Sequence, residues 1–138
     1  LSVALENYQR LCESRPQMNA SFIESDLFTG IQTKERYEII VSNPPYIRTS
    51  VIDELMPEVR EHEPLMALDG REDGLYFYRK ITGQAKDYLT NGGMLFYEIG
   101  YDQAEDVYKI MEHEGFREIE IIKDFAGLDR VVYGSWFG

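Results

Sequence analysis

Hydrophobic positions recur at two different spacings along this chain, and their alternation predicts an α/β protein. In residues 1–12, 75–89 and 102–111, apolar side chains return every three or four positions, as they do on one face of a helix. Shorter runs rich in β-branched and aromatic residues occupy positions 21–24, 37–42, 94–99, 117–123 and 130–136. Helices that alternate with such runs predict a doubly wound, Rossmann-like sheet, and the last two runs predict a terminal antiparallel pair.

Breakers and capping residues set the expected helix limits. Pro16 should end the first helix, and Asn91-Gly92-Gly93 should end the second as a C-cap. Asp102 followed by Glu105 has the spacing of a capping box, so the third helix should begin there and end at Gly115. These signals separate each helix from the strand that follows it.

The run Tyr37–Ser42 shows no polar alternation in its centre, which is typical of a strand covered on both faces. It ends at Asn43, and the next buried run, residues 94–99, ends at Glu98-Ile99-Gly100. Ligands of open α/β sheets bind beyond such carboxyl ends. After the strand that ends at Asn43, residues 48–74 form a long, charged connection with one expected helix at Val51–Met56. Connections of this length are usually functional.

Composition narrows the class of partner. The chain has 138 residues, a formal net charge of -11 and a pI near 4.6. Such a charge repels phosphate backbones, so direct binding of nucleic acid is disfavoured and a basic protein surface is favoured. Cys12 is the single cysteine, which excludes an intrachain disulfide and a cysteine-rich metal site. With no membrane-length apolar run and no signal-peptide pattern, we expect a cytoplasmic protein.

The tetrapeptide Asn43-Pro44-Pro45-Tyr46 is the strongest candidate for chemistry. An amide or aromatic amine nitrogen is a poor nucleophile, so a site that methylates it must hold it and polarise its two N–H bonds. The Asn43 side-chain oxygen and the Pro44 carbonyl can each accept one of these protons, the prolines fix the loop in advance, and Tyr46 offers an aromatic wall. A stiff turn after a strand is the plain alternative, but its place at the sheet edge favours a binding function.

With its neighbours, this motif makes the chain resemble the release factor glutamine methyltransferases, the HemK/PrmC family. These enzymes methylate the glutamine in the Gly-Gly-Gln tip of class I peptide chain release factors. The resemblance runs over essentially the whole chain, in this order: Ser25-Asp26-Leu27-Phe28, Ile40–Ile47, Glu63-Pro64, Asp73-Gly74-Leu75, Gly92-Gly93, Glu98-Ile99-Gly100, Gln103 and Ala126–Val132.

The resemblance implies a class I methyltransferase fold, S-adenosylmethionine as cofactor and release factors as partners. Asn43 and Pro44 would be the catalytic residues that hold the glutamine carboxamide, with Pro45 and Tyr46 completing the substrate pocket. Asn43 would also lie near the methionine end of the cofactor. Asp26 and Leu27 would form the turn on its adenine side.

In the resembled family, the Gly-rich cofactor loop and an N-terminal helical domain precede the position of Leu1. Residues 1–138 are therefore expected to form a partial catalytic domain, with most of the cofactor site upstream and no activity of their own. Without the preceding strand, Tyr37–Ser42 would expose an apolar edge, which predicts rearrangement, strand exchange or dimerisation.

Two other functions stay open from the sequence. A nucleic-acid methyltransferase acting on adenine N6 or guanine N2 faces the same problem of a planar nitrogen, and a methyltransferase-like module without catalysis would also lack the Gly-rich loop. Single residues have plain interpretations too. Glu98 can be a site contact but is more often solvated, His62 is expected at the surface, and the acidic stretch Asp53–Glu63 is expected to be a solvated face rather than a docking site.

Overall fold

The computed structural model describes residues 1–138 except 16, 18, 33–35 and 53–63. The chain divides into two compact units, Leu1–Lys34 and Glu35–Gly138. The first unit contains helix α1 (Ser2–Ser14), as predicted, while the expected stop at Pro16 lies outside the described residues. The strand predicted at residues 21–24 is wrong, because these residues run without a ladder partner in the described part of this unit.

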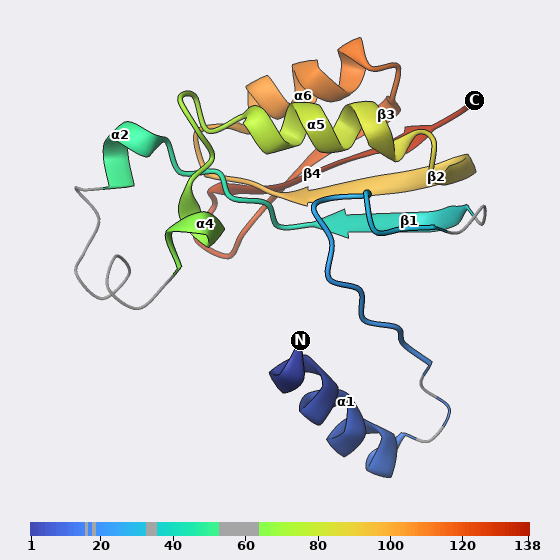
Figure 1. Cartoon of the computed structure of the whole chain (residues 1–138). Coiled ribbons are helices and arrows are strands. Elements are labelled where there is room, and N and C mark those ends of the chain that lie inside the picture. Colours follow the sequence, from blue (N-terminus) through green and yellow to red (C-terminus); the bar gives the residue numbers. More distant parts are fainter. Residues whose placement is uncertain (16, 18, 33–35, 53–63) are drawn as a thin grey trace. The chain divides into compact units, whose positions relative to one another are not determined.

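The second unit is built on a mixed four-stranded sheet (Figure 1). Its strands are β1 (Tyr37–Ser42), β2 (Leu89–Glu98), β3 (Arg117–Lys123) and β4 (Asp129–Trp136), in the order β1-β2-β4-β3. β1 runs parallel to β2, whereas β4 runs antiparallel to both β2 and β3. The predicted terminal antiparallel pair is confirmed.

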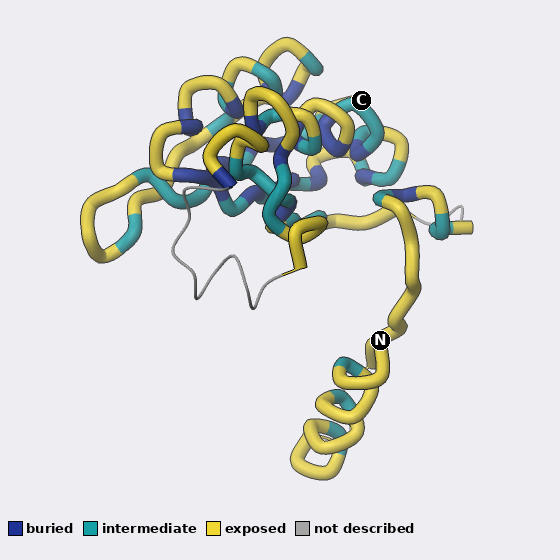
Figure 2. The backbone as a smooth tube through the Cα atoms, turned by 60° about the vertical axis from the view of Figure 1, so that its left-hand side comes forward, coloured by how far each residue is buried: buried dark blue, intermediate teal, exposed yellow. Residues whose placement is uncertain are grey.

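Helices α5 (Tyr76–Ala85) and α6 (Ala104–His113) cover one face of this sheet, and the core lies between them and the strands (Figures 1 and 2). Period-two alternation along β2 sends Leu95 and Tyr97 into that core. The larger buried side chains that meet them come from α5, α6 and β4: Tyr78, Ile81, Val107, Met111 and Val132. Burial is therefore concentrated on the helix side of the sheet.

The opposite face corrects the expectation that β1 is covered on both sides. β1 is an edge strand, and Ile39 and Val41 on it are 58% and 74% exposed. Their register partners on β2 are Met94 and Phe96, so these side chains share one face. Phe96 also stacks on Tyr133, with ring centroids 4.8 Å apart. The apolar run was identified correctly as a strand, but its composition did not reveal that one side lacks a neighbour.

Two element limits also differ from the predictions. α5 ends at Ala85 rather than at Asn91-Gly92-Gly93, because the next residues join the sheet: the Tyr37 N–H donates to the Tyr88 carbonyl over 2.7 Å. Gly92 then lies within β2 with a φ of +81°, where the register with β1 is irregular. Its positive φ therefore serves a strand irregularity rather than a helix end.

The capping box predicted at Asp102 and Glu105 does not form. The N-cap of α6 is Gln103, one residue later, and it makes no side-chain bond to the helix N-terminus. Glu105 instead bonds to Lys109 one turn along. The other end is as predicted, since Gly115, with a φ of +93°, follows the helix.

The described residues of the connection between β1 and α5 include two short helices, α2 (Thr49–Ile52) and α4 (Leu65–Leu68). The helix predicted at Val51–Met56 is thus described only as far as Ile52. Among the described helices, none is both long enough and apolar enough to cross a bilayer.

Candidate functional site

Asn43 and Glu98 meet at the carboxyl edge of the sheet. β1 and β2 are parallel, and Ser42 lies opposite Tyr97, so the next residue of each strand leaves the sheet at the same point. The Asn43 side chain donates a hydrogen bond from Nδ2 to Oε2 of Glu98 over 3.1 Å. The topology thus brings together two polar side chains that are 55 positions apart.

This bond fixes which end of the Asn43 amide is left for a ligand. An ionised carboxylate only accepts hydrogen bonds, so the NH2 group of Asn43 must face Glu98. The amide oxygen, Oδ1, then remains as an acceptor. The side chain of Asn43 is exposed, so a ligand can reach this oxygen. Sequence reasoning undervalued Glu98, and the matched ends of two parallel strands were the signal that could have identified it.

The residues after Asn43 form one wall of a small pocket. Pro44 is buried and Tyr46 is half-buried. With Asn43 they line a pocket of about 320 Å3, whose other lining residues are Ile47, Ala67 and Leu68. Pro45 is half-buried and does not line this pocket. The structure therefore brings three of the four predicted substrate residues to one cavity, with α4 as its opposite wall.

A second hollow lies on the other side of Asn43. It has a volume of about 420 Å3 and is lined mainly by apolar side chains of β1 and β2 together with Glu98 and Val131. Ile39, Val41 and Phe96 contribute its apolar surface. Asn43 lines both hollows, so it lies between the pocket beside α4 and the open apolar face of the sheet.

Backbone and side-chain bonds hold the segment after the pocket. Ile47 and Asp69 form a parallel bridge, in which the Ile47 N–H donates to the Leu68 carbonyl and the Gly70 N–H donates to the Ile47 carbonyl. The Asp69 carboxylate accepts from the Thr49 hydroxyl over 2.6 Å and from the backbone N–H of Arg71 over 2.9 Å. These bonds, the Thr49 hydroxyl first, hold the pKa of Asp69 below its usual range.

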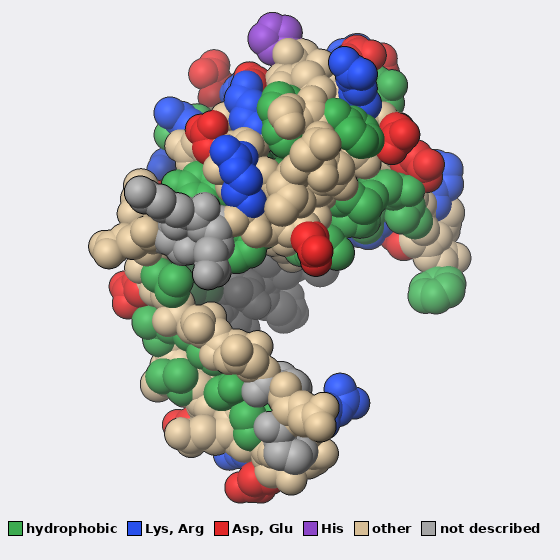
Figure 3. All heavy atoms as spheres, turned by 90° about the vertical axis from the view of Figure 1, so that its right-hand side faces the viewer, with side chains coloured by type: hydrophobic (Ala, Val, Ile, Leu, Met, Phe, Trp, Pro, Cys, Tyr) green, Lys and Arg blue, Asp and Glu red, His purple; other side chains and the backbone are tan. Residues whose placement is uncertain are grey.

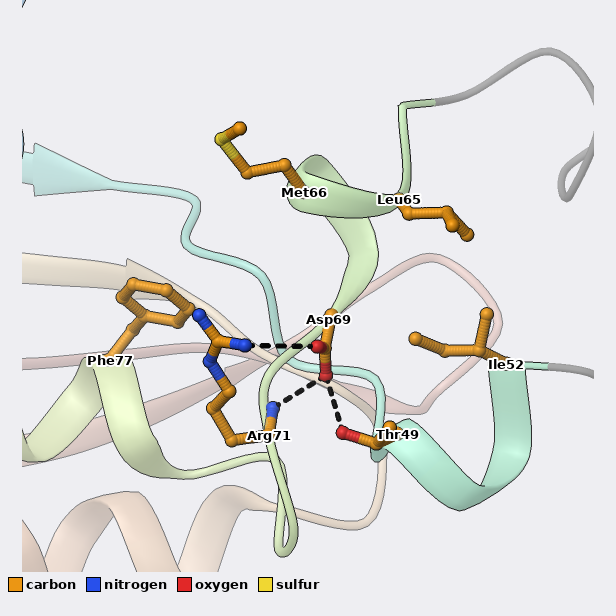
Figure 4. A pocket seen from close by; sticks show the side chains of 7 residues that line it. All are labelled: Thr49, Ile52, Leu65, Met66, Asp69, Arg71 and Phe77. Atoms are coloured by element: carbon orange, nitrogen blue, oxygen red, sulfur yellow. Dashed lines mark hydrogen bonds and ion pairs between the residues drawn. The ribbon is translucent and has the colours of Figure 1, made fainter.

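The Asp69 carboxylate lies at the centre of a further pocket next to α4 (Figure 4). This pocket has a volume of about 390 Å3, and its apolar lining comes from α2, α4 and α5: Ile52, Leu65, Met66 and Phe77. Because α4 separates it from the pocket at Asn43, the two cavities share one short helix as a wall.

Two buried tyrosines support the strand that carries Glu98. The Tyr78 hydroxyl donates to the Glu98 backbone carbonyl over 3.0 Å, and its ring packs edge-on against Tyr97 at 5.1 Å between centroids. Burial raises the pKa of both phenols, so both stay neutral near pH 7. They act as hydrogen-bonding core residues rather than as acids or bases.

Asp26 and Leu27, the predicted adenine-side residues, belong to the first unit and form a tight turn there. The Asp26 carbonyl accepts from the Thr29 hydroxyl over 2.7 Å, and the Ser25 hydroxyl donates to the Leu27 carbonyl. Leu27 has a φ of 51°, an unusual value for a branched residue. The turn predicted from the sequence is confirmed, whereas the roles of Asp26 and Leu27 in cofactor binding stay predictions.

The charged and metal-binding side chains of the described residues indicate neither a nucleic-acid track nor a metal site on the surface that Figure 3 shows. Acidic and basic side chains are interspersed over the face shown in Figure 3, without a continuous basic track. Over the same described residues, His, Cys, Asp and Glu form no cluster that would hold a metal ion. The expectations for His62 and for the acidic stretch Asp53–Glu63 lie outside the described residues.

Comparison with known proteins found strong sequence relatives. No family model matches the chain. It is 54% identical over 102 residues to "Release factor glutamine methyltransferase" of Clostridium acetobutylicum, which covers 74% of this chain and 36% of the relative. It is 42% identical over 134 residues to the protein of the same name from Caulobacter vibrioides, covering 97% of this chain and 45% of the relative. The chain thus spans less than half the length of these relatives.

The fold was compared separately. A crystal structure of a methyltransferase from Pyrococcus furiosus matches with a TM-score of 0.60 and 17% identity, over 96% of this chain and 57% of that one. At this identity the likeness concerns the fold alone. The predicted methyltransferase-like α/β fold is confirmed, with the chain covering part of it.

Proposed function

Because the chain is homologous over most of its length to the release factor glutamine methyltransferases, we propose that it is the substrate-binding part of such an enzyme. The reaction is methylation of the side-chain nitrogen of the glutamine in the Gly-Gly-Gln motif of peptide chain release factors. The observation that carries the proposal is the Asn43–Glu98 pair, which leaves Oδ1 of Asn43 as an acceptor beside Pro44 and Tyr46.

The two acceptors act on the two N–H bonds of the carboxamide. Oδ1 of Asn43 accepts a hydrogen bond from one N–H and the Pro44 carbonyl accepts one from the other, so the nitrogen is held with one face open for in-line attack. The Tyr46 ring lies against the flat amide group. The nitrogen loses a proton readily once it carries the methyl group, so orientation and electrostatics contribute more to the rate than a strong base does.

S-adenosylmethionine, the cofactor that the relationship implies, supplies a methyl group on a sulfonium when bound. The described residues fit only part of such a ligand: Asn43 and Glu98 offer an amide and a carboxylate at the sheet edge. We propose that Asn43 lies at the methionine end, that Asp26 and Leu27 lie near the adenine, and that most of the site belongs to residues preceding Leu1.

The test is methyl transfer by the complete gene product. Purified enzyme with radiolabelled cofactor is offered a release factor, the same factor with the glutamine of its Gly-Gly-Gln motif changed to alanine, duplex DNA and RNA. We expect label in the unmodified release factor alone. Label in DNA or RNA would instead support the amino-methyltransferase of nucleic acids, and no label with any substrate would support a module without catalysis.

A further inference from the structure

Gln103 makes three hydrogen bonds that the predicted site does not explain. Its side chain is 4% exposed. Nε2 donates to the Tyr46 carbonyl over 3.1 Å and to the Gly74 carbonyl over 3.3 Å, and Oε1 accepts from the Gly100 N–H over 3.1 Å. One amide group therefore joins the end of the Asn-Pro-Pro-Tyr loop, the segment before α5 and the turn after β2.

Three glycines leave room for this arrangement. A Cβ at Gly74 would lie 2.5 Å from the Tyr46 oxygen and 2.7 Å from Nε2 of Gln103. A Cβ at Gly70 would lie 2.7 Å from Cα of Tyr46, and one at Gly100 would lie 2.9 Å from Oε1 of Gln103. The Tyr46 backbone and the Gln103 amide thus lie so close to these glycines that a side chain at any of the three positions would clash with them.

The side-chain bonds of Gln103 also distinguish it from an ordinary N-cap residue of α6. A glutamine is a poor N-cap compared with serine or aspartate, yet Gln103 holds that position and its side chain turns away from the helix. Ordinary helix capping is therefore not what the side chain does. Its amide instead bonds to backbone groups of Tyr46, Gly74 and Gly100, which would otherwise lack these partners.

Resting on the proposed function, we propose that Gln103 is a positioning residue for methyl transfer, which fixes the Tyr46 peptide and through it the Pro44 carbonyl and the Tyr46 ring. The loop is held at its other end by the Asn43–Glu98 bond. With both ends fixed, the two acceptors keep one spacing before the substrate arrives. Gln103 itself touches no substrate atom.

The test compares two variants in the complete enzyme. Gln103→Met removes all three bonds at similar volume, and we expect kcat to fall about tenfold or more, with KM for the release factor changed less, since misplaced groups reduce turnover. Gln103→Glu keeps an acceptor for Gly100 but sets an oxygen against the Tyr46 carbonyl. If the donor to Tyr46 is what matters, Gln103→Glu loses at least as much kcat as Gln103→Met.

Thr82→Val is the matched control. The Thr82 hydroxyl is buried and bonds to the Tyr78 carbonyl and the Tyr97 hydroxyl, within the core between α5 and β2. We expect this variant to lower Tm to an extent similar to Gln103→Met but to keep kcat within about twofold of the wild type. Amide hydrogen exchange of residues 46–49 should increase in Gln103→Met and not in Thr82→Val.

Three kinetic results for the variants would overturn the inference: wild-type kcat in Gln103→Met, recovery of kcat in Gln103→Glu, or an equal loss of kcat in Thr82→Val. The last would mean that general destabilisation explains the effect. A wild-type enzyme that transfers no methyl group would refute the proposed function and the catalytic role together. Unchanged amide hydrogen exchange of residues 46–49 in Gln103→Met would separately refute the hold on the loop.

Discussion

In the hydrogen-bonded pair of the Asn43 amide and the Glu98 carboxylate, one atom of residue 98 decides which side chain donates. Glu98→Gln replaces an oxygen by an NH2 group of nearly the same size, which can donate to Oδ1 of Asn43 and let the Asn43 amide turn over. The acceptor for the substrate N–H is then lost in part of the molecules. We expect kcat to fall about tenfold in steady-state assays, the equivalent of one weakened hydrogen bond.

Glu105→Gln is the control for this substitution. Glu105 lies on α6 and pairs with Lys109 at the surface, so the same chemical change there should leave kcat unaltered. Equal kcat values for Glu98→Gln and the wild type would contradict the assigned orientation of the Asn43 amide.

Asn43 itself is expected to have the larger effect. Asn43→Ala removes the acceptor while Pro44 and Tyr46 keep their places, so kcat should fall about a hundredfold, as for other single preorganised groups at reacting centres. Single-turnover measurements with saturating cofactor test this. A loss confined to KM would mean that Asn43 binds the substrate without assisting transfer.

The bonds of Glu98 and Gln103 to the Asn-Pro-Pro-Tyr motif were not predicted from the sequence, and the reason is spatial. Asn43, Pro44 and Tyr46 are adjacent in sequence, so a motif identifies them. Glu98 and Gln103 bond to that motif from 55 and 57 positions away. Only the parallel register of β1 and β2 and the course of the chain after β2 bring them there, and neither is visible as a local pattern.

At the scale of elements, substitutions at two glycines with positive φ distinguish the cost of backbone strain from the cost of steric crowding. Gly74 (φ +75°) and Gly127 (φ +80°) have similar conformations, but a Cβ at Gly127 meets nothing within 4 Å whereas one at Gly74 meets Tyr46 and Gln103. We expect Gly127→Ala to reduce the free energy of unfolding by about 1 kcal/mol. Gly74→Ala should cost about 1–3 kcal/mol more.

Urea unfolding of the two variants provides the measurement. Equal losses would mean that the loop adapts to the added methyl group, and that the packing around the Tyr46 carbonyl is looser than the distances suggest. A larger loss at Gly127 would contradict the steric account altogether.

The turn between β3 and β4 should respond to acid. The backbone N–H of Leu128, followed by the Arg130 guanidinium, holds the pKa of Asp124 below its usual range. A carboxyl group with a lowered folded-state pKa contributes stability above its unfolded pKa of about 3.9, and this contribution is lost as pH falls through the folded value.

We therefore expect the stability difference between wild type and Asp124→Asn to be constant near neutral pH and to shrink below about pH 4. Free energies of unfolding measured across this range test the expectation. Asp87→Asn, at an exposed position in the turn after α5, serves as the control. A difference for Asp124→Asn that does not change with pH would show that the charge contributes nothing.

Element type was predictable where one stretch of sequence carries its own signal. The runs 117–123 and 130–136 became β3 and β4, and the helical spacing in residues 1–12 became α1. The ends of elements and the burial of their faces were less predictable, because both depend on which other segments pack beside them. Residues 86–89 leave α5 to meet the start of β1, residues 21–24 have no such partner among the described residues of their unit, and the exposure of Val41 depends on what stands beside β1.

At the scale of the whole molecule, affinity for the cofactor measures how much of the site this chain holds. We expect calorimetry to give a dissociation constant for S-adenosylmethionine at least about tenfold higher for residues 1–138 than for the complete gene product, because the proposed site places preorganised contacts to most of the ligand outside these residues. Micromolar affinity of the isolated chain would contradict this expectation.

The exposed edge and face of β1 predict self-association of the isolated chain. An edge strand offers unpaired N–H and C=O groups, and here Ile39 and Val41 add apolar surface. Analytical ultracentrifugation at high protein concentration should show dimers, and Val41→Lys should shift them to monomers. Val3→Lys, at an exposed position of α1, should not. A monomeric wild-type chain would contradict the prediction.

The bridge between Ile47 and Asp69 has a consequence for protein engineering. The bonds of Ile47 and Thr49 to residues 68–71 fasten the two ends of the intervening stretch to each other. These bonds should therefore survive a change in the length of the chain that joins the two segments, since the entropic cost of closing a longer connection grows only logarithmically. An affinity tag or a fluorescent reporter inserted into that connection should accordingly leave the Ile47–Asp69 bridge, and with it Asn43, undisturbed.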